Sequence, residues 1–238
     1  MRATLFGVPA SHPTLAAQLM LEHKKIRYRR IDLVPAAHRA MVRALGFPGV
    51  TVPALRLAGA RLQGTTQIAL ALDALVPSPP LFPADPERRA AVMEAESWGN
   101  EVLQPLTRRL IWNAMGRDRS TLPSYLEDQR SGLPTGVAAA IAPPFAAAAR
   151  WLNRATNENA ARDLDALPGV LAHVDELINR GVIGGRERNA ADFQIATSLS
   201  LLLTMDDIRP LIEGRPAERL ARDVVSRQPG RMPPVFAP

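Results

Sequence analysis

The chain has 238 residues, 47% of them hydrophobic and 22% charged, which is the composition of a globular protein and argues against general disorder. No stretch approaches the roughly 20 apolar residues of a membrane span, and the first residues lack the apolar core of a signal peptide. The sequence therefore predicts a cytoplasmic protein that makes no use of a membrane. It contains no cysteine, which excludes disulfides, a cysteine nucleophile and a cysteine-based metal site.

Positive charge is concentrated in the first third of the chain. Residues 1–80 carry ten Lys or Arg against three acids, although the net charge of the whole chain is only +6. Five of these cations surround one aromatic residue, Tyr28: they are Lys24, Lys25, Arg27, Arg29 and Arg30. Binding of single-stranded nucleic acid normally uses several aromatic platforms, so we expect no nucleic-acid partner. A small carboxylate-bearing ligand, or simple solvation of the arginines, remains as the explanation.

The first 75 residues alternate between strand-like and helix-like patterns. A short apolar run at 3–7 predicts a strand, and Leu15, Ala16, Leu19 and Met20 recur at the spacing of a helix that begins near Pro13. Further patterns predict a strand from Ile26 to Pro35, a helix at 36–45, strands at 52–57 and 61–63, and a helix at 65–75. The resulting order is β-α-β-α-β-β-α.

A proline-rich segment separates this region from the rest of the chain. Residues 76–86 read VPSPPLFPADP, and five prolines exclude a helix or a central strand there. Beyond it, amphipathic patterns predict helices at 87–115, 134–155, 158–179, 189–205 and 216–227. We therefore expect a first domain at 1–76, a linker at 77–86, an all-helical domain at 87–230 and a Pro-rich tail at 231–238.

Four short motifs follow one another in a fixed order. Ser11-His12-Pro13 precedes a helix ending in LEHKKI, and the later motifs are GFPGVTVPAL at 46–55, LQGTTQI at 62–68 and NAADF at 189–193. In order and spacing they resemble the glutathione S-transferase family. The resemblance implies an α+β/α fold, with a thioredoxin-like βαβ–ββα N-terminal domain and an all-α C-terminal helical bundle. It also implies a homodimer joined through the helix at 65–75 and the long helix from Glu87.

The resemblance places a thiol cofactor against the Val52–Pro53 dipeptide. We predict that this peptide bond is cis, which leaves the backbone N–H and C=O of Val52 free for an extended ligand. The alternative is an ordinary trans proline at the start of a strand. Thr65, at the start of the following helix, would offer a hydroxyl and backbone N–H groups to a carboxylate, with Gly64 and Thr66 beside it.

Gly64 departs from the family pattern, which has a glutamate at that position. The missing acid removes a partner for the ammonium group of glutathione. The predicted co-substrate is therefore glutathione or another low-molecular-weight thiol.

Ser11 is the predicted catalytic residue. Its hydroxyl and the positive end of the following helix together would stabilise a bound thiolate, the role that serine has in one branch of the family. No tyrosine occurs before Tyr28, and the absence of cysteine excludes a cysteine-type site. The alternative is that Ser11 only caps the helix.

The resemblance implies that the first long C-terminal helix forms a wall of the substrate pocket. We expect His12, Trp98, Trp112 and Met115 to line that pocket, since about four helical turns separate the two tryptophans and put them on one face. The alternative is that this face packs against other helices or a second subunit. The neighbouring Arg108 and Arg109 either contact an anion or form a solvated face.

Two further predictions concern residues without a chemical role. The histidines show no metal-ligand spacing, so we predict no metal. Asn189 and Asp192 are interpreted as a structural capping box before a buried helix.

Two classes of function fit this sequence. The first is an enzyme that transfers a thiol to a small hydrophobic electrophile, with Ser11 and the Val52-Pro53 motif in its favour. The second is a non-catalytic protein of the same fold that binds a hydrophobic ligand or joins an assembly, which Gly64 favours.

Overall fold

The computed structural model describes residues 3–35 and 37–236. Its N-terminal part is a four-stranded sheet of β1 (Ala3–Gly7), β2 (Tyr28–Asp32), β3 (Ala54–Leu57) and β4 (Ala60–Gln63). The strands lie in the order β2-β1-β3-β4, with β1 parallel to β2 and antiparallel to β3, and with β3 antiparallel to β4. This is the thioredoxin-like topology, and the predicted fold class is confirmed.

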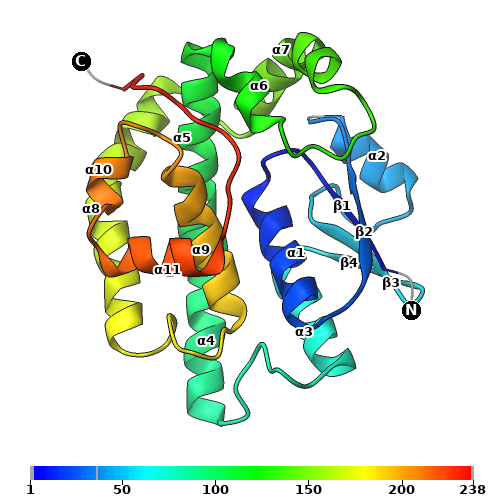
Figure 1. Cartoon of the computed structure of the whole chain (residues 1–238), viewed down its shortest axis with the longest axis vertical. Coiled ribbons are helices and arrows are strands. Elements are labelled where there is room, and N and C mark those ends of the chain that lie inside the picture. Colours follow the sequence, from blue (N-terminus) through cyan, green and yellow to red (C-terminus); the bar gives the residue numbers. More distant parts are fainter. Residues whose placement is uncertain (1–2, 36, 237–238) are drawn as a thin grey trace.

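Helices cover both faces of this sheet (Figure 1). Helices α1 (His12–His23) and α3 (Thr65–Leu75) lie on the face turned toward the rest of the chain, and α2 (His38–Ala44) lies on the other. Successive side chains of β1 point to opposite faces of the sheet. Leu5 belongs to the core shared with α1, whereas Phe6 packs with Val42 of α2 in a second, smaller cluster. The predicted start of the second helix at Ala36 lies outside the described residues.

The Pro-rich segment is firmly attached to the first domain. The ammonium group of Lys24 donates to Asp73 Oδ1 at 2.6 Å and to the carbonyl oxygens of Val76 and Pro79 at 2.6 and 2.5 Å. Asp73 in turn accepts from the backbone N–H of Leu81 at 2.7 Å. Lys24 is 3% exposed, so one member of the predicted basic cluster is an internal structural cation.

The remainder of the chain is helical. Its helices are α4 (Pro86–Trp98), α5 (Gln104–Arg117), α6 (Leu122–Tyr125), α7 (Thr135–Leu152), α8 (Asn157–Asn179), α9 (Ala190–Leu202), α10 (Arg209–Ile212) and α11 (Pro216–Val224). A π-helical turn, Gly99–Leu103, joins α4 to α5, and a 3₁₀ turn, Arg119–Thr121, precedes α6. The sequence predicted the long helices, but it gave no signal for the π turn or for α6.

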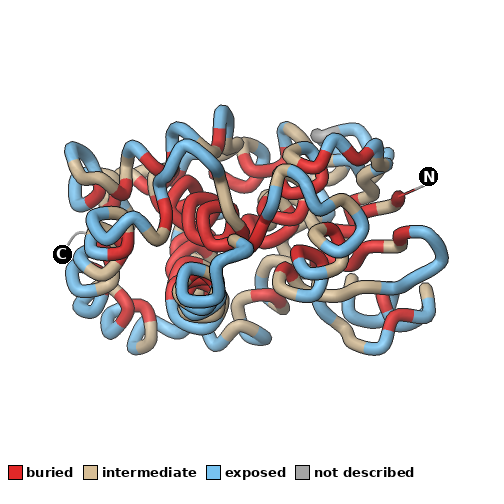
Figure 2. The backbone as a smooth tube through the Cα atoms, turned by 90° about the horizontal axis from the view of Figure 1, so that it is seen from below, coloured by how far each residue is buried: buried red, intermediate tan, exposed pale blue. Residues whose placement is uncertain are grey.

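Helix α9 forms the centre of the molecule. Every one of its residues is buried, and it packs against α1 and α3 of the first domain as well as α4, α5 and α11. Figure 2 shows this concentration of buried backbone in the middle of the molecule. The predicted capping box is present, because Asn189 Oδ1 accepts from the N–H of Asp192 and Asp192 Oδ2 accepts from the N–H of Asn189.

The segment after α11 lies against the helical domain up to residue 236, the last described (Figure 1). Met232 is fully buried and bonds with Thr204 and Asp206 through its backbone, and Val235 accepts from the Arg117 guanidinium at 3.0 Å. Residues 237 and 238 of the predicted tail lie outside the described residues. Among the helices of the described ranges, none is long and apolar enough to cross a membrane.

Candidate functional site

Ser11 is the N-cap of α1, and its hydroxyl still has a hydrogen to donate. Its Oγ accepts from the Thr14 N–H at 3.3 Å and from the Thr14 hydroxyl at 2.9 Å. A serine hydroxyl accepts two hydrogen bonds and donates one, and no acceptor for this donor is found among residues 3–35 and 37–236. Capping the helix and donating to a ligand are therefore compatible roles for one side chain.

The loop that faces Ser11 contains the Val52–Pro53 bond, which is cis as predicted. Within the described part of the chain, neither backbone group of Val52 bonds to another backbone group. The carbonyl of Pro53 accepts from the N–H of Gly64 at 2.9 Å, which places the start of α3 next to this loop. The structure thus brings together Val52, Pro53, Gly64 and Thr65, four of the five predicted cofactor-binding residues.

Gln63 holds the loop in place, a role that no motif predicted. Its Oε1 accepts from the N–H of Gly49 at 2.5 Å and its Nε2 donates to the carbonyl of Thr51 at 2.9 Å. A Cβ at Gly49 would come within 2.8 Å of Gln63 Oε1, so a side chain there would displace the Gln63 amide group. Gln63 therefore positions the residues that lead into Val52.

The two threonines at the start of α3 differ in their surroundings. Thr65 is buried, and its hydroxyl makes no hydrogen bond of normal geometry with any residue that the structure describes. The hydroxyl of Thr66 instead donates to Glu96 on α4, with Oγ1–Oε1 and Oγ1–Oε2 distances of 2.8 and 3.0 Å. Burial raises the pKa of Glu96, and the hydroxyls of Thr66 and Thr65 oppose that rise. An acid is thus present near the position where Gly64 replaces one, but it comes from the other domain.

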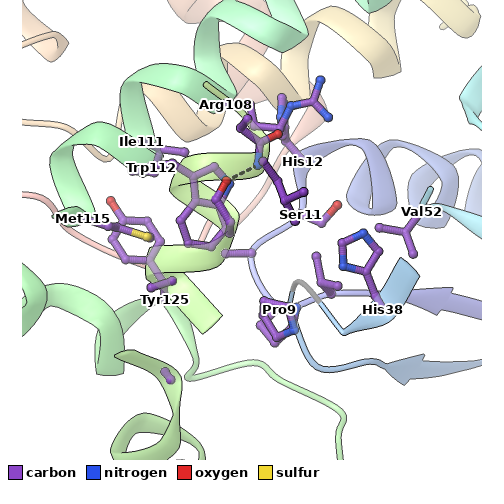
Figure 3. A pocket seen from close by; sticks show the side chains of 18 of the residues that line it. Pro9, Ser11, His12, His38, Val52, Arg108, Ile111, Trp112, Met115 and Tyr125 are labelled. Atoms are coloured by element: carbon purple, nitrogen blue, oxygen red, sulfur yellow. Dashed lines mark hydrogen bonds between the residues drawn. The ribbon is translucent and has the colours of Figure 1, made fainter. Parts of the chain in front are cut away.

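A cavity of about 180 Å³ lies beside Ser11, between the two domains. The N-terminal domain contributes Ser11, His12, His38 and Val52, and the helical domain contributes an apolar wall that includes Ile111, Trp112, Met115 and Tyr125. Figure 3 shows the Ser11 hydroxyl and the His38 ring on the same side of the cavity as Val52, across from Trp112. The cavity therefore combines a polar end with an apolar wall.

Both histidines of the cavity are neutral near pH 7. Burial and the nearby Arg108 lower the pKa of His12 to about 3, and its Nδ1 lies 2.9 Å from Ser198 Oγ on α9. Burial and Arg39 lower the pKa of His38 to about 4. His12 Nε2 and His38 Nδ1 are buried without a hydrogen-bond partner in the described chain. His12 was a predicted pocket residue, whereas nothing in the sequence pointed to His38.

The structure separates the two predicted tryptophans. Trp112 and Met115 line the cavity, but Trp98 packs on the His173 ring with centroids 4.4 Å apart. The π-helical turn at Gly99–Leu103 lies between them. One residue inserted into a helix rotates the following face by roughly 100°, so simple counting of 3.6-residue turns fails across it.

Tyr125 and α7 complete the cavity and were not foreseen. Tyr125 lies on the short helix α6, and its hydroxyl bonds to Thr204 Oγ1 at 2.8 Å. Helix α7 contributes its small residues Ala142, Ala146 and Ala149, which leave room for a ligand. Neither segment carries a motif, because their side chains converge only through packing between distant parts of the chain.

Neighbouring arginines on α5 have opposite environments. Arg109 forms a two-pronged ion pair with Asp163 of α8, with both N–O distances at 2.6 Å. Arg108 lines the cavity instead, and no carboxylate lies within 4.0 Å of it in the described residues. Burial and Arg109 lower the pKa of Arg108. The sequence left open whether these arginines contact an anion or solvent, and the structure gives Arg109 an anion from within the chain, Asp163.

The cis proline and the capped helix meet at one cavity between a thioredoxin-like sheet and a helical domain. A family model described as the glutathione S-transferase N-terminal domain matches residues 5–80. Residues 5–80 therefore match the glutathione S-transferase family in sequence, and the chain as a whole has the fold of that family. No curated protein matches it in sequence.

Solved structures share this fold over nearly the whole chain at low sequence identity. Glutathione transferase F7 from Populus trichocarpa is 13% identical with a TM-score of 0.67, covering 94% of both chains. FzlA from C. crescentus is 15% identical with a TM-score of 0.65, covering 99% of this chain and 97% of its own. A glutathione S-transferase from Methylobacterium radiotolerans, in complex with glutathione sulfonate, is 18% identical with a TM-score of 0.62, covering 95% of this chain and 92% of its own.

Proposed function

We propose that the protein transfers a thiol, glutathione in the first place, to a small hydrophobic electrophile bound in the cavity. The observation that carries the proposal is the position of Ser11: a hydroxyl with a hydrogen to donate lies at the positive end of α1, on the cavity surface. A hydrogen bond to a charged sulfur and the helix end both favour the thiolate over the thiol. The thiolate is the nucleophilic form.

The residues around Ser11 fit a peptide-like thiol. Such a ligand supplies the sulfur nucleophile when bound. Val52 offers a backbone N–H and C=O, and Thr65, the first residue of α3, offers its backbone N–H. The relative from Methylobacterium radiotolerans with bound glutathione sulfonate supports glutathione as the first thiol to test. The apolar wall of Trp112 and Met115 suits the electrophile.

Calorimetric titration with glutathione, followed by a transfer assay with chlorodinitrobenzene, tests this function. We expect binding with a dissociation constant in the millimolar range or tighter, and enzyme-dependent loss of the chloride. Absence of glutathione binding would contradict the proposal.

One observation favours the second candidate, a ligand-binding protein without catalysis. Glu96 already engages Thr66 at the start of α3, so part of the surface that would receive the amino-acid end of glutathione is occupied by the chain itself. Binding of hydrophobic ligands in the absence of any thiol, with no transfer in the assay above, would support this alternative.

We further propose that the protein is a homodimer joined through α3 and α4. Large apolar side chains are exposed on these elements and the π turn: Leu70 is 38%, Met93 41% and Val102 41% exposed. A C₂ dimer would cover such residues on both copies at once. Analytical sedimentation should give a dimer at micromolar concentration, and Met93→Glu should shift it toward monomer. A monomeric wild-type protein would overturn this proposal.

A further inference from the structure

The charges that face the cavity are all positive. Among its lining residues are the cations Arg39 and Arg108 and the two neutral histidines, His12 and His38, and none of these lining residues is an Asp or Glu. Arg39 is exposed at the mouth, but Arg108 is only partly exposed. The interior of the cavity therefore carries one uncompensated positive charge.

Arg108 is the first cavity-lining residue of α5, at the N-terminal end of the apolar wall. It shares one face of α5 with Ile111, Trp112 and Met115, which follow it at i+3, i+4 and i+7 and also line the cavity. Its only recorded side-chain hydrogen bond in the described chain goes to Gln104 Oε1 at 3.5 Å, at the limit for such a bond. A guanidinium has five N–H donors, so most of its capacity is unused.

A half-buried cation of this kind is costly without an anion. Removal from water disfavours the charge unless a partner replaces the lost solvation. The neighbouring Arg109 shows the usual solution, a two-pronged pair with Asp163. His12 is a second group with an unused hydrogen-bonding atom. It is 3% exposed, and its Nε2 has no hydrogen-bond partner in the residues described.

From this geometry we propose that the acceptor substrate is a small carboxylate, whose apolar body packs on Trp112 and Met115 and whose carboxylate pairs with Arg108. The proposal rests on the transfer function above and narrows its substrate class. A planar guanidinium matches a carboxylate with two parallel hydrogen bonds. One uncompensated charge suits a monoanion.

The volume of the cavity limits the size of that acid. A cavity of about 150 Å³ lined by aliphatic and aromatic side chains is known to hold benzene. At about 180 Å³, this cavity has room for one aromatic ring with a small substituent. Benzoate is therefore a suitable probe, and benzamide is its neutral counterpart of nearly the same shape.

The test measures benzoate and benzamide binding by calorimetry in the absence of any thiol. Because a hydrogen-bonded charge is lost with benzamide, benzoate should bind the wild-type protein about ten- to a hundred-fold more tightly. Arg108→Met should remove that preference. The substitution breaks no ion pair within the described chain, because no carboxylate pairs with Arg108 there. Arg39→Met is the matched control at the mouth, where an exposed charge should change benzoate affinity by at most about fivefold.

Three results would overturn the inference: equal affinity of wild type for both probes, an unchanged preference for benzoate in Arg108→Met, or a larger loss of benzoate affinity in Arg39→Met than in Arg108→Met.

Glutathione titrations of the same variants show whether Arg108 binds a carboxylate of the acceptor or a carboxylate of glutathione. If Arg108→Met weakens glutathione as much as benzoate, the residue serves the thiol ligand, and the acceptor assignment is wrong. Thermal melting confirms that each variant is folded. Because no thiol is present in the probe titrations, their failure is distinct from a failure of glutathione binding.

Discussion

The two sides of the cavity are built in different ways. The N-terminal domain presents polar groups at the points where elements begin: Ser11 caps α1, Val52 precedes β3 and Thr65 begins α3. The helical domain presents side chains from the middle of α5 and α7, such as Trp112 and Ala146. The N-termini of helices and the loops expose backbone N–H groups, which can bind a polar thiol ligand. The faces of helices instead present apolar side chains. The polar side thus depends on local geometry and the apolar side on packing between distant segments.

Lys24→Met should have the largest effect on the free energy of unfolding, because Lys24 connects α1 to the inter-domain segment. Removing the cation leaves Asp73 without its ion-pair partner, and breaking a buried pair in this way costs about 3–5 kcal/mol. Chemical denaturation should show this loss of unfolding free energy. Lys25→Met is the matched control, since Lys25 is exposed and should change stability little. Equal effects of the two variants would contradict the role given to Lys24.

The pH dependence of stability should isolate His12, the residue that links the cavity to α9. Its folded pKa of about 3 lies below the ordinary value of 6.5, so the unfolded chain takes up the proton first. The stability from the neutral imidazole is complete above pH 6.5 and is lost as the pH falls. At about pH 4.5 the loss should be roughly 2–3 kcal/mol relative to His12→Asn, from ~1.36 kcal/mol per pH unit. Parallel stability profiles of the two proteins would contradict this.

Ser11→Ala sharpens the comparison on the polar side. Loss of a hydrogen bond to a charged sulfur, about 1.5–3 kcal/mol, should lower kcat/KM by about ten- to a hundred-fold. The pKa of the bound thiol should rise by about one to two units. Stability should fall by about 0.5–2 kcal/mol, because the cap is also lost.

The Ser11→Thr variant keeps the hydroxyl and should restore much of the thiol effect. If Ser11→Ala loses stability while its bound thiol titrates as in wild type, Ser11 is a helix cap and nothing more. This outcome would remove the residue from the chemistry while leaving the fold unchanged.

Ala146→Leu sharpens the comparison on the apolar side with the smallest expected effect. The larger side chain would enter the cavity from α7, and overpacking of this kind should weaken acceptor binding by roughly five- to tenfold. Ala147→Leu, at an exposed neighbouring position, is the control. Titration with benzoate distinguishes them, and a similar result for both variants would mean that the cavity does not hold the acceptor.

The contrast between the two sides also explains what the sequence could predict. Pro13 and the Gly64-Thr65 junction are local signals that correctly predicted the beginnings of α1 and α3, and the resemblance of the Val52-Pro53 motif to the family predicted the cis bond correctly. The capping box at Asn189 was predicted in the same way, since its partners lie three residues apart. Such features require only a few neighbouring residues to be specified.

The remaining features depend on contacts that no short window contains. Glu96 reaches Thr66 from another domain, and Tyr125 reaches the cavity from a helix of only four residues. The π turn before α5 rotates Trp98 away from the face of Trp112. A pattern with a regular helical period does not predict such a turn. The environments of Arg108 and Arg109 likewise differ because of a distant residue, Asp163 of α8, which pairs with Arg109.

The ultraviolet absorbance of the thiolate, followed as glutathione bound to the wild-type protein is titrated with base, tests the central claim most directly. The account predicts that the bound thiol ionises well below the ordinary thiol pKa of about 8.5. It also predicts that this shift is reduced in Ser11→Ala. Glutathione that fails to bind at millimolar concentration, or that binds and ionises as it does free in solution, would contradict the account.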